Sequence, residues 1–286
     1  MDPDLEVRRT GRAMGTTYLM VTAKADGVLL DDAVALLDDL ESRWSRFVVD
    51  SEICRLNRNP GVPVIVSPDT FAVVQAAVDG AEATGGRFDP TVHDSLVALG
   101  YDRTFDDMTL AGGGEPHPAP GVCGIELDAA LHAITVPHGV RIDLGGIGKG
   151  TAADLATELV MSNGASGVAV SIGGDLRVRG ESPSGAGWRF TDDWGRLPFP
   201  ALADGGLCTS TTCRRRWTTP RGDAHHVVDP RTGTPTDGTV ECITVVGATA
   251  QQAEILTKAA MVAGPEAAAF LEPFGVRHVI HWSTAA

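Results

Sequence analysis

The stretch RIDLGGIGKGTAADLATELV, residues 141–160, places four glycines and Lys149 between a strand-like start and a helix-like finish. A glycine turn at the start of a helix exposes backbone N–H groups, and a lysine beside it adds a full positive charge. These groups can hold a phosphate. The other interpretation is a tight turn whose lysine is solvated, and the residues alone leave both open.

This stretch matches neither of the two common nucleotide motifs. If Gly148 and Lys149 were the "GK" of a Walker A loop, Asp143 would occupy the first glycine position and Gly150 the final Ser/Thr position. The dinucleotide motif G-x-G-x-x-G also fails, because residues 146–150 are one residue too short. If this turn binds a phosphate, it does so in a fold other than the P-loop and dinucleotide-binding folds.

Three more segments carry candidate side chains: Asp89 before a proline, three consecutive arginines at 214–216, and the pair His225-His226 before DPRTG. Each has a purely structural alternative, namely a capping acid, a solvated basic run and a histidine bonded to the turn. Consecutive residues of a strand face opposite ways, so at most one histidine reaches a given site as a general base.

Composition limits the class of protein. The chain has 286 residues, 43% hydrophobic and 21% charged, which is typical of soluble globular domains. Its formal charge of −14 argues against nucleic acid or a membrane surface as partner, although a local basic pocket can still hold a small phosphorylated ligand. We find no export signal and expect a cytoplasmic protein. Its five scattered cysteines are then expected to be reduced thiols.

The elements that must position these residues follow from periodicity and caps. Strands are predicted at 17–23, 132–137, 167–180 with a break at a glycine pair, 241–248 and 277–283. Helices are predicted at 31–47, 67–86, 151–162 and 249–264, with caps at Asp31 or Asp32, at Ser67, and at Thr249 with Gln252. Mixed hairpin and crossover signals favour an α+β fold with mixed, largely antiparallel sheets flanked by helices. We expect one domain over residues 1–286, with two sub-lobes that could meet at the Gly/Pro-rich segment 110–121.

In this order, eight segments resemble the flavin transferases that attach FMN to proteins with FAD as donor (FAD:protein FMN transferase, the ApbE family). The segments are MGTTY (14–18), SRFVVDSEICRLN (45–57), FDPTV (88–92), DLGGIGKG (143–150), SIGGDLRVRG (171–180), CTSTTCRRRW (208–217), HHVVDPRTGTP (225–235) and TAQQAEILTKAAMV (249–262).

The resemblance implies that a Ser or Thr hydroxyl of a protein acceptor attacks the FMN phosphorus of FAD and that AMP leaves. It also implies the residues that bind FAD: Met14, Phe47, Arg87, Phe88, Asp89, Asp143 and Lys149, with His226 and Val228 against the flavin. Displacement at a pyrophosphate needs positioning and charge neutralisation, which the glycine turn and Lys149 can supply. The base that removes the hydroxyl proton is Asp143 or His226, and the sequence leaves this choice open.

The family's Mg²⁺ site is where this sequence departs from the resemblance. The positions implied as metal ligands hold Gly146 in the turn and Gln251, Glu254 and Lys258 on the helix. A protonated lysine cannot ligate a hard cation. Three interpretations stay open: the Lys258 ammonium replaces the metal, the protein binds FAD with weak or no turnover, or a shifted Mg²⁺ binds Glu254, turn carbonyls and water. With water as nucleophile, the same site would instead be an Mg²⁺-dependent hydrolase that converts FAD to FMN and AMP.

Overall fold

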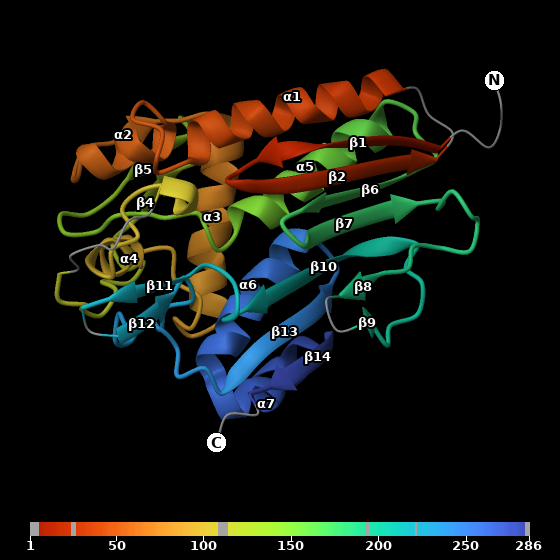
Figure 1. Cartoon of the computed structure of the whole chain (residues 1–286). Helices are drawn as coiled ribbons and strands as arrows, with labels where there is room; N and C mark the ends of the chain where they lie inside the picture. Colours follow the sequence, from red (N-terminus) through yellow and green to blue (C-terminus); the bar gives the residue numbers. More distant parts are fainter. Residues whose placement is uncertain (1–5, 24–26, 108–113, 193–194, 221, 284–286) are drawn as a thin grey trace.

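The computed structural model describes residues 6–23, 27–107, 114–192, 195–220 and 222–283. Its main feature is a seven-stranded sheet in the order β1-β2-β6-β7-β10-β13-β14 (Figure 1). The strands are β1 Glu6–Ala13, β2 Thr16–Ala23, β6 Gly167–Ile172, β7 Asp175–Gly180, β10 Asp204–Thr211, β13 Val240–Gly247 and β14 Arg277–Trp282. Every neighbouring pair in this sheet is antiparallel, which confirms the predicted α+β class.

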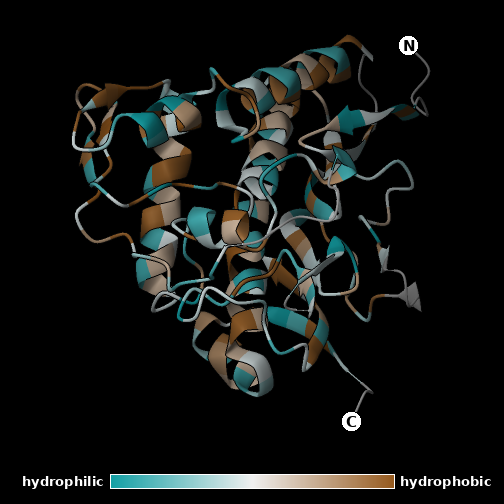
Figure 2. Ribbon diagram, turned by 60° about the vertical axis from the view of Figure 1, so that its left-hand side comes forward, coloured by the Kyte–Doolittle hydropathy of each residue, from teal (hydrophilic) through white to brown (hydrophobic). Residues whose placement is uncertain are grey.

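A layer of helices packs against this sheet. The layer consists of α1 Gly27–Trp44, α5 Gly148–Ser162 and α6 Ala250–Ala263, and α5 contacts both other helices. Along β6, Val168, Val170 and Ile172 are buried beneath the helices, while Ala169 between them belongs to a second apolar cluster. This alternation is the period of a strand covered on both faces. The helices carry both hydrophobic and hydrophilic residues, as expected when one side of a helix is buried (Figure 2).

The rest of the chain surrounds this two-layer body. The second cluster lies under the segment that carries the short strands β8 Thr191–Asp192 and β9 Gly195–Arg196. The remaining elements are α2 Glu52–Arg58, β3 Val64–Ile65, α3 Pro68–Ala83, α4 His93–Ala98, β4 Glu126–Asp128, β5 Ala133–Thr135, β11 Arg216–Thr219, β12 Gly222–His225, α7 Ala267–Leu271 and three single 3-10 turns at Phe105–Asp107, Gly264–Glu266 and Glu272–Phe274. No helix in the described part of the chain combines the length and apolarity needed to cross a membrane.

The predicted caps are confirmed for two helices and wrong for one. Ser67 accepts a hydrogen bond from Thr70 N at the start of α3, and Thr249 does the same for Gln252 N at the start of α6. Helix α1, however, begins at Gly27, so Asp31 and Asp32 lie inside it and cannot be its cap. Asp31 instead pairs with Arg9 of β1, Nε to Oδ1 at 2.6 Å.

Two predicted elements have other boundaries in the structure, and both differences affect the site. Helix α5 begins at Gly148, three residues earlier than predicted, so Lys149 and Gly150 lie in its first turn. The interrupted strand at 167–180 is a hairpin of β6 and β7 with Gly173 and Gly174 at its tip, both at positive φ. The division into sub-lobes near 110–121 stays a prediction, and residues 108–113 lie outside the described residues.

Candidate active site

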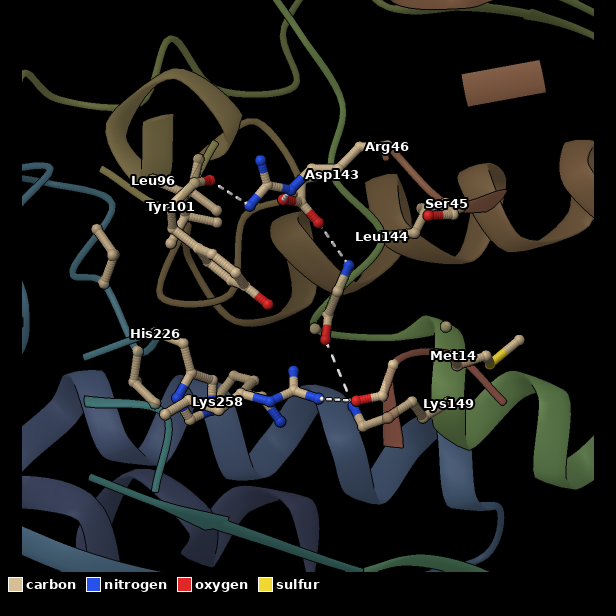
Figure 3. Close-up of a pocket in the computed structure, with 18 of the residues that line it drawn as sticks. Met14, Ser45, Arg46, Leu96, Tyr101, Asp143, Leu144, Lys149, His226 and Lys258 are labelled. Carbon is tan, nitrogen blue, oxygen red and sulfur yellow. Dashed lines mark hydrogen bonds and ion pairs between the residues drawn. The ribbon is translucent and has the colours of Figure 1, made fainter. Parts of the chain in front are cut away.

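A pocket of about 330 Å³ is lined by residues from the end of α1, from α4, α5 and α6, and from the segment that follows β12. It brings together residues from distant parts of the sequence (Figure 3). Every residue predicted to bind FAD or to act in catalysis lines it: Met14, Phe47, Arg87, Phe88, Asp89, Asp143, Lys149, His226 and Val228. Gly146 and Lys258 line it too, whereas Glu254 lies beneath its floor, fully buried.

The glycine turn reaches the pocket because it follows a firmly anchored strand-like segment. Asp143 N donates to Pro90 O at 2.7 Å, and Ile142 exchanges hydrogen bonds with the side chain of Asn57. After Leu144 the chain turns directly into α5, with Gly148 N bonded to Leu144 O. The turn therefore presents Gly145 and Gly146 at the pocket wall and Lys149 at its floor.

Gly150 fixes how closely α5 approaches α6. A Cβ at this position would lie 2.6 Å from Ala250 O and 2.9 Å from Gln251 N, both backbone atoms. Its own N–H donates to Glu254 Oε2 at 2.7 Å. Only glycine permits this contact, which places the first turn of α5 against the first two turns of α6.

We expect Gly150→Ala to destabilise the protein, because the two helix ends must separate to admit the methyl group. Overpacking of this kind costs about 1–3 kcal/mol, and urea unfolding measures it. Gly148→Ala is the matched control in the same helix, since its Cβ would meet side-chain atoms no closer than 3.8 Å. Equal unfolding free energies for the two variants would contradict the role given to Gly150.

Lys149 is the centre of a buried charge cluster. Its Nζ lies 2.9 Å from Asp175 Oδ2 and 2.5 Å from Glu254 Oε1. Burial alone would lower the pKa of Lys149, but the two carboxylates outweigh burial and raise this pKa above its usual value. Burial raises the pKa of Glu254, and repulsion from Asp175 adds to the rise. Lys149 and Lys258 hold the pKa of Asp175 below its usual value despite burial.

Asp143 anchors the turn rather than standing free. Its Oδ2 pairs with Arg46 Nε at 2.8 Å, and its Oδ1 accepts from Gly145 N at 2.7 Å. Both side chains of the pair are more than nine-tenths buried. Arg46 also donates to Tyr101 O at 2.6 Å. This network joins the glycine turn to the loop after α4.

The two histidines have different surroundings. His225 is buried and bonded to the chain, with Nδ1 accepting from Val227 N and Nε2 within 3.3 Å of Thr236 O. His226 lines the pocket, and its Nδ1 is buried with no hydrogen-bond partner among the described residues. Burial lowers the pKa of His226 well below 6.5, and the charges of Lys258, Arg215, Lys149 and His225 lower it further.

The other end of the pocket is apolar and aromatic. Leu96, Tyr101 and Val228 form a buried cluster against which Phe47 and Phe105 pack. The Arg46 guanidinium lies 4.3 Å from the centroid of the Phe47 ring and 4.7 Å from that of Tyr101. Figure 3 shows Arg46 and Asp143 on one side of the pocket, with His226 and Lys258 facing them from the other. A planar ring system fits the aromatic end of the pocket, and an anion fits the side that carries Lys258.

The remaining predicted contacts have local partners as well. Asp89 accepts from Thr91 N and Thr91 Oγ1 in a local turn, while α4 (His93–Ala98) has no side-chain cap, and burial raises the pKa of Asp89. Of the arginine run, Arg215 lines the pocket and donates to Gly15 O at 3.2 Å. Met14 adopts a φ of 53°, and its backbone N donates to Glu41 Oε2 at 2.6 Å.

The donor set does not suit a divalent cation. Glu254 directs Oε1 at Lys149 and Oε2 at Gly150 N, and the ammonium of Lys258 lies 3.8 Å from Oε1. Gln251 donates its side-chain amide to Thr151 Oγ1. In the ranges that the structure describes, no three His, Cys, Asp or Glu side chains are grouped to hold a metal. The assignment of Gly146 and Glu254 as Mg²⁺ contacts stays a prediction that this geometry does not favour.

Sequence reasoning missed several residues of the site, among them Arg46, Tyr101 and Asp175. Asp175 is only 2% exposed at the start of β7, within the segment SIGGDLRVRG that carries part of the family resemblance. A charged residue directly after the glycine pair that interrupts the predicted strand was the available signal. Arg46 and Tyr101 are 55 positions apart, and only the folded chain brings them together.

Comparison with known proteins agrees with the geometry. The ApbE family matches residues 14–280. The chain is 26% identical over 279 residues to the FAD:protein FMN transferase of Vibrio cholerae (92% of this chain, 83% of that protein). It is 34% identical over 277 residues to that of Klebsiella pneumoniae (90% and 79%). The crystal structure of the ApbE protein of Thermotoga maritima has a TM-score of 0.85 at 25% identity, covering 99% of this chain and 96% of that one. The expected fold is thereby confirmed, and the chain belongs to the ApbE family.

Proposed function

We propose that this protein transfers FMN from FAD to a Ser or Thr hydroxyl of a protein acceptor and releases AMP. The observation that carries the proposal is one pocket with an aromatic, apolar end and a cationic end at a glycine turn. FAD has the same two parts, planar rings and a pyrophosphate. The relatives named above carry this activity in their names.

The proposed reaction is a displacement at phosphorus. The acceptor oxygen bonds to the phosphorus of the FMN half, the bond from that phosphorus to the bridging oxygen breaks, and the bridging oxygen leaves on AMP. The charge of the pyrophosphate is met by the ammonium groups at the pocket floor, beside the glycine turn. Both Lys149 and Lys258 line this floor.

We assign the base to His226 rather than to Asp143. Both oxygens of Asp143 already accept hydrogen bonds, from Arg46 and from Gly145. His226 lines the pocket, and its lowered pKa keeps the imidazole neutral and able to accept a proton near neutral pH. The hydroxyl proton therefore goes to an imidazole nitrogen of His226.

A pH profile tests this assignment. Because the neutral imidazole is the active form and its pKa lies below 6.5, we expect the rate of AMP release to hold down to pH 6.5 and to fall only at more acidic pH. His226→Gln should be slow and should lack this acidic limb, while the dissociation constant for FAD changes little. A half-maximal rate at or above pH 6.5 would contradict the assignment.

The activity itself is tested by incubating the protein with FAD and candidate Ser/Thr acceptor proteins. Chromatography measures AMP, and flavin fluorescence on a denaturing gel measures covalent transfer. We expect one AMP per flavin attached to a Ser or Thr of the acceptor. FMN and AMP without covalent flavin would identify a hydrolase instead. Bound FAD without AMP, with every acceptor tried, would identify a flavin-binding protein.

A further inference from the structure

We propose that the Lys258 ammonium occupies the place of a divalent cation beside the FAD pyrophosphate, so that this protein binds and cleaves FAD without a metal. This inference rests on the proposed function and specifies how the site neutralises its substrate.

The position of Lys258 in the pocket supports this proposal. Its side chain lies directly beside the glycine turn, since a Cβ on Gly146 would be 3.7 Å from Lys258 Cγ. Its Nζ lies 3.8 Å from Glu254 Oε1, and the residue lines the pocket that holds His226 and Lys149 (Figure 3). A cation bound between the turn and Glu254 would have to share this space with the ammonium.

The charges around Lys149 also disfavour a bound metal ion. Lys149 is engaged by both Asp175 and Glu254, so these three side chains carry one net negative charge. Lys258 brings the cluster to neutrality. A bound Mg²⁺ would add two positive charges next to two ammonium groups and would find both oxygens of Glu254 already bonded. The cluster therefore already holds two ammonium groups beside its two carboxylates.

Lys258 is also held for interaction with an anion. Its Nζ donates to Ser210 Oγ at 2.9 Å, and Ser210 Oγ donates in turn to Thr257 Oγ1 at 2.9 Å. Ser210 and Thr257 are both buried, which fixes the direction of the ammonium. An ammonium group has three N–H donors, so donors remain for phosphate oxygens after the bond to Ser210.

The residue type at position 258 fits the same role. Of the 23 basic residues, only Lys24, Lys149 and Lys258 are lysines. Lys24 lies outside the described residues, and the other two both contact Glu254. Lysine carries a compact, strongly hydrated point charge, whereas arginine carries a planar fork. A compact point charge is therefore the better substitute for a small cation. Almost all other basic residues of this chain are arginines.

The test measures FAD affinity by calorimetry and AMP release by chromatography, each with EDTA and with Mg²⁺. For the unaltered protein we expect both quantities to agree within about twofold between the two conditions. Lys258→Gln should weaken FAD binding at least about tenfold in EDTA, the effect of losing a charge-assisted contact. Arg103→Gln, which removes an exposed positive charge paired with Asp102, is the control and should change neither quantity.

The outcomes separate this inference from the proposed function. If the unaltered protein binds and cleaves FAD only with Mg²⁺, the inference is overturned and the proposed function is not contradicted. If it binds FAD in neither condition, both are overturned. Because the comparison of EDTA with Mg²⁺ uses the unaltered protein, it does not depend on the folding of Lys258→Gln.

Discussion

Lys149→Met is expected to abolish measurable FAD binding and to lower the free energy of unfolding by about 3–5 kcal/mol. The substitution keeps a side chain of similar length but removes the ammonium that lies between Asp175 and Glu254. These two carboxylates are 2% and 0% exposed, so water cannot replace the lost partner. Breaking a buried pair from one side is costly because an uncompensated charge stays behind. Calorimetric titration with FAD and urea unfolding measure the two effects.

A second substitution separates stability from binding. Glu254→Gln removes one of the two negative charges, while the oxygen of the new amide can still accept from Gly150 N. The double variant Lys149→Met with Glu254→Gln should therefore recover part of the stability and none of the FAD affinity. If Lys149→Met binds FAD like the unaltered protein, the phosphate role given to the glycine turn and its lysine is wrong.

Asp143→Ala is the other substitution with a large expected effect. It leaves Arg46 buried without its carboxylate and frees Gly145 N, so we expect a loss of about 3–5 kcal/mol in unfolding free energy. FAD affinity should also fall, because the turn loses its anchor and the Arg46 guanidinium loses its fixed position over Phe47 and Tyr101.

The control for Asp143 is Asp102→Ala. Asp102 pairs with Arg103 through side chains that are about half exposed. Exposed pairs contribute about 0–1 kcal/mol, so urea unfolding should detect little change in this variant. Equal losses in the two variants would contradict the view that the buried Arg46–Asp143 pair holds the turn.

Local signals were sufficient for much of the fold. Ser67 and Thr249 were predicted as caps because each supplies a side-chain oxygen to the N–H three residues on, which the sequence alone determines. The start of α1 could not be found in this way. The first turns of α1 are stabilised by burial of Leu30. Asp31 pairs with Arg9 of β1, a strand whose many polar residues give no clear strand pattern in the sequence.

The residues of the candidate site also fall into two groups, those that a local sequence pattern predicts and those that only the folded chain brings together. Lys149 and Asp143 could be predicted because a glycine turn directly before a helix is a local sequence pattern that is typical of anion binding. Asp175 and Arg46 were not predicted, because an ion pair between distant segments produces no recognisable spacing of residues in the sequence. The contact between Gly150 and α6, 100 positions later, is likewise a property of the packed helices, although glycine at that position is visible in the sequence.

The most direct test of the central claim is a crystal structure of the protein with FAD, grown in EDTA. We predict that the flavin lies against Phe47 and Val228, with the pyrophosphate bonded to the glycine turn and to Lys258 Nζ. Flavin density elsewhere on the protein, or an empty pocket in crystals that bind FAD, would contradict the claim that this pocket is the active site.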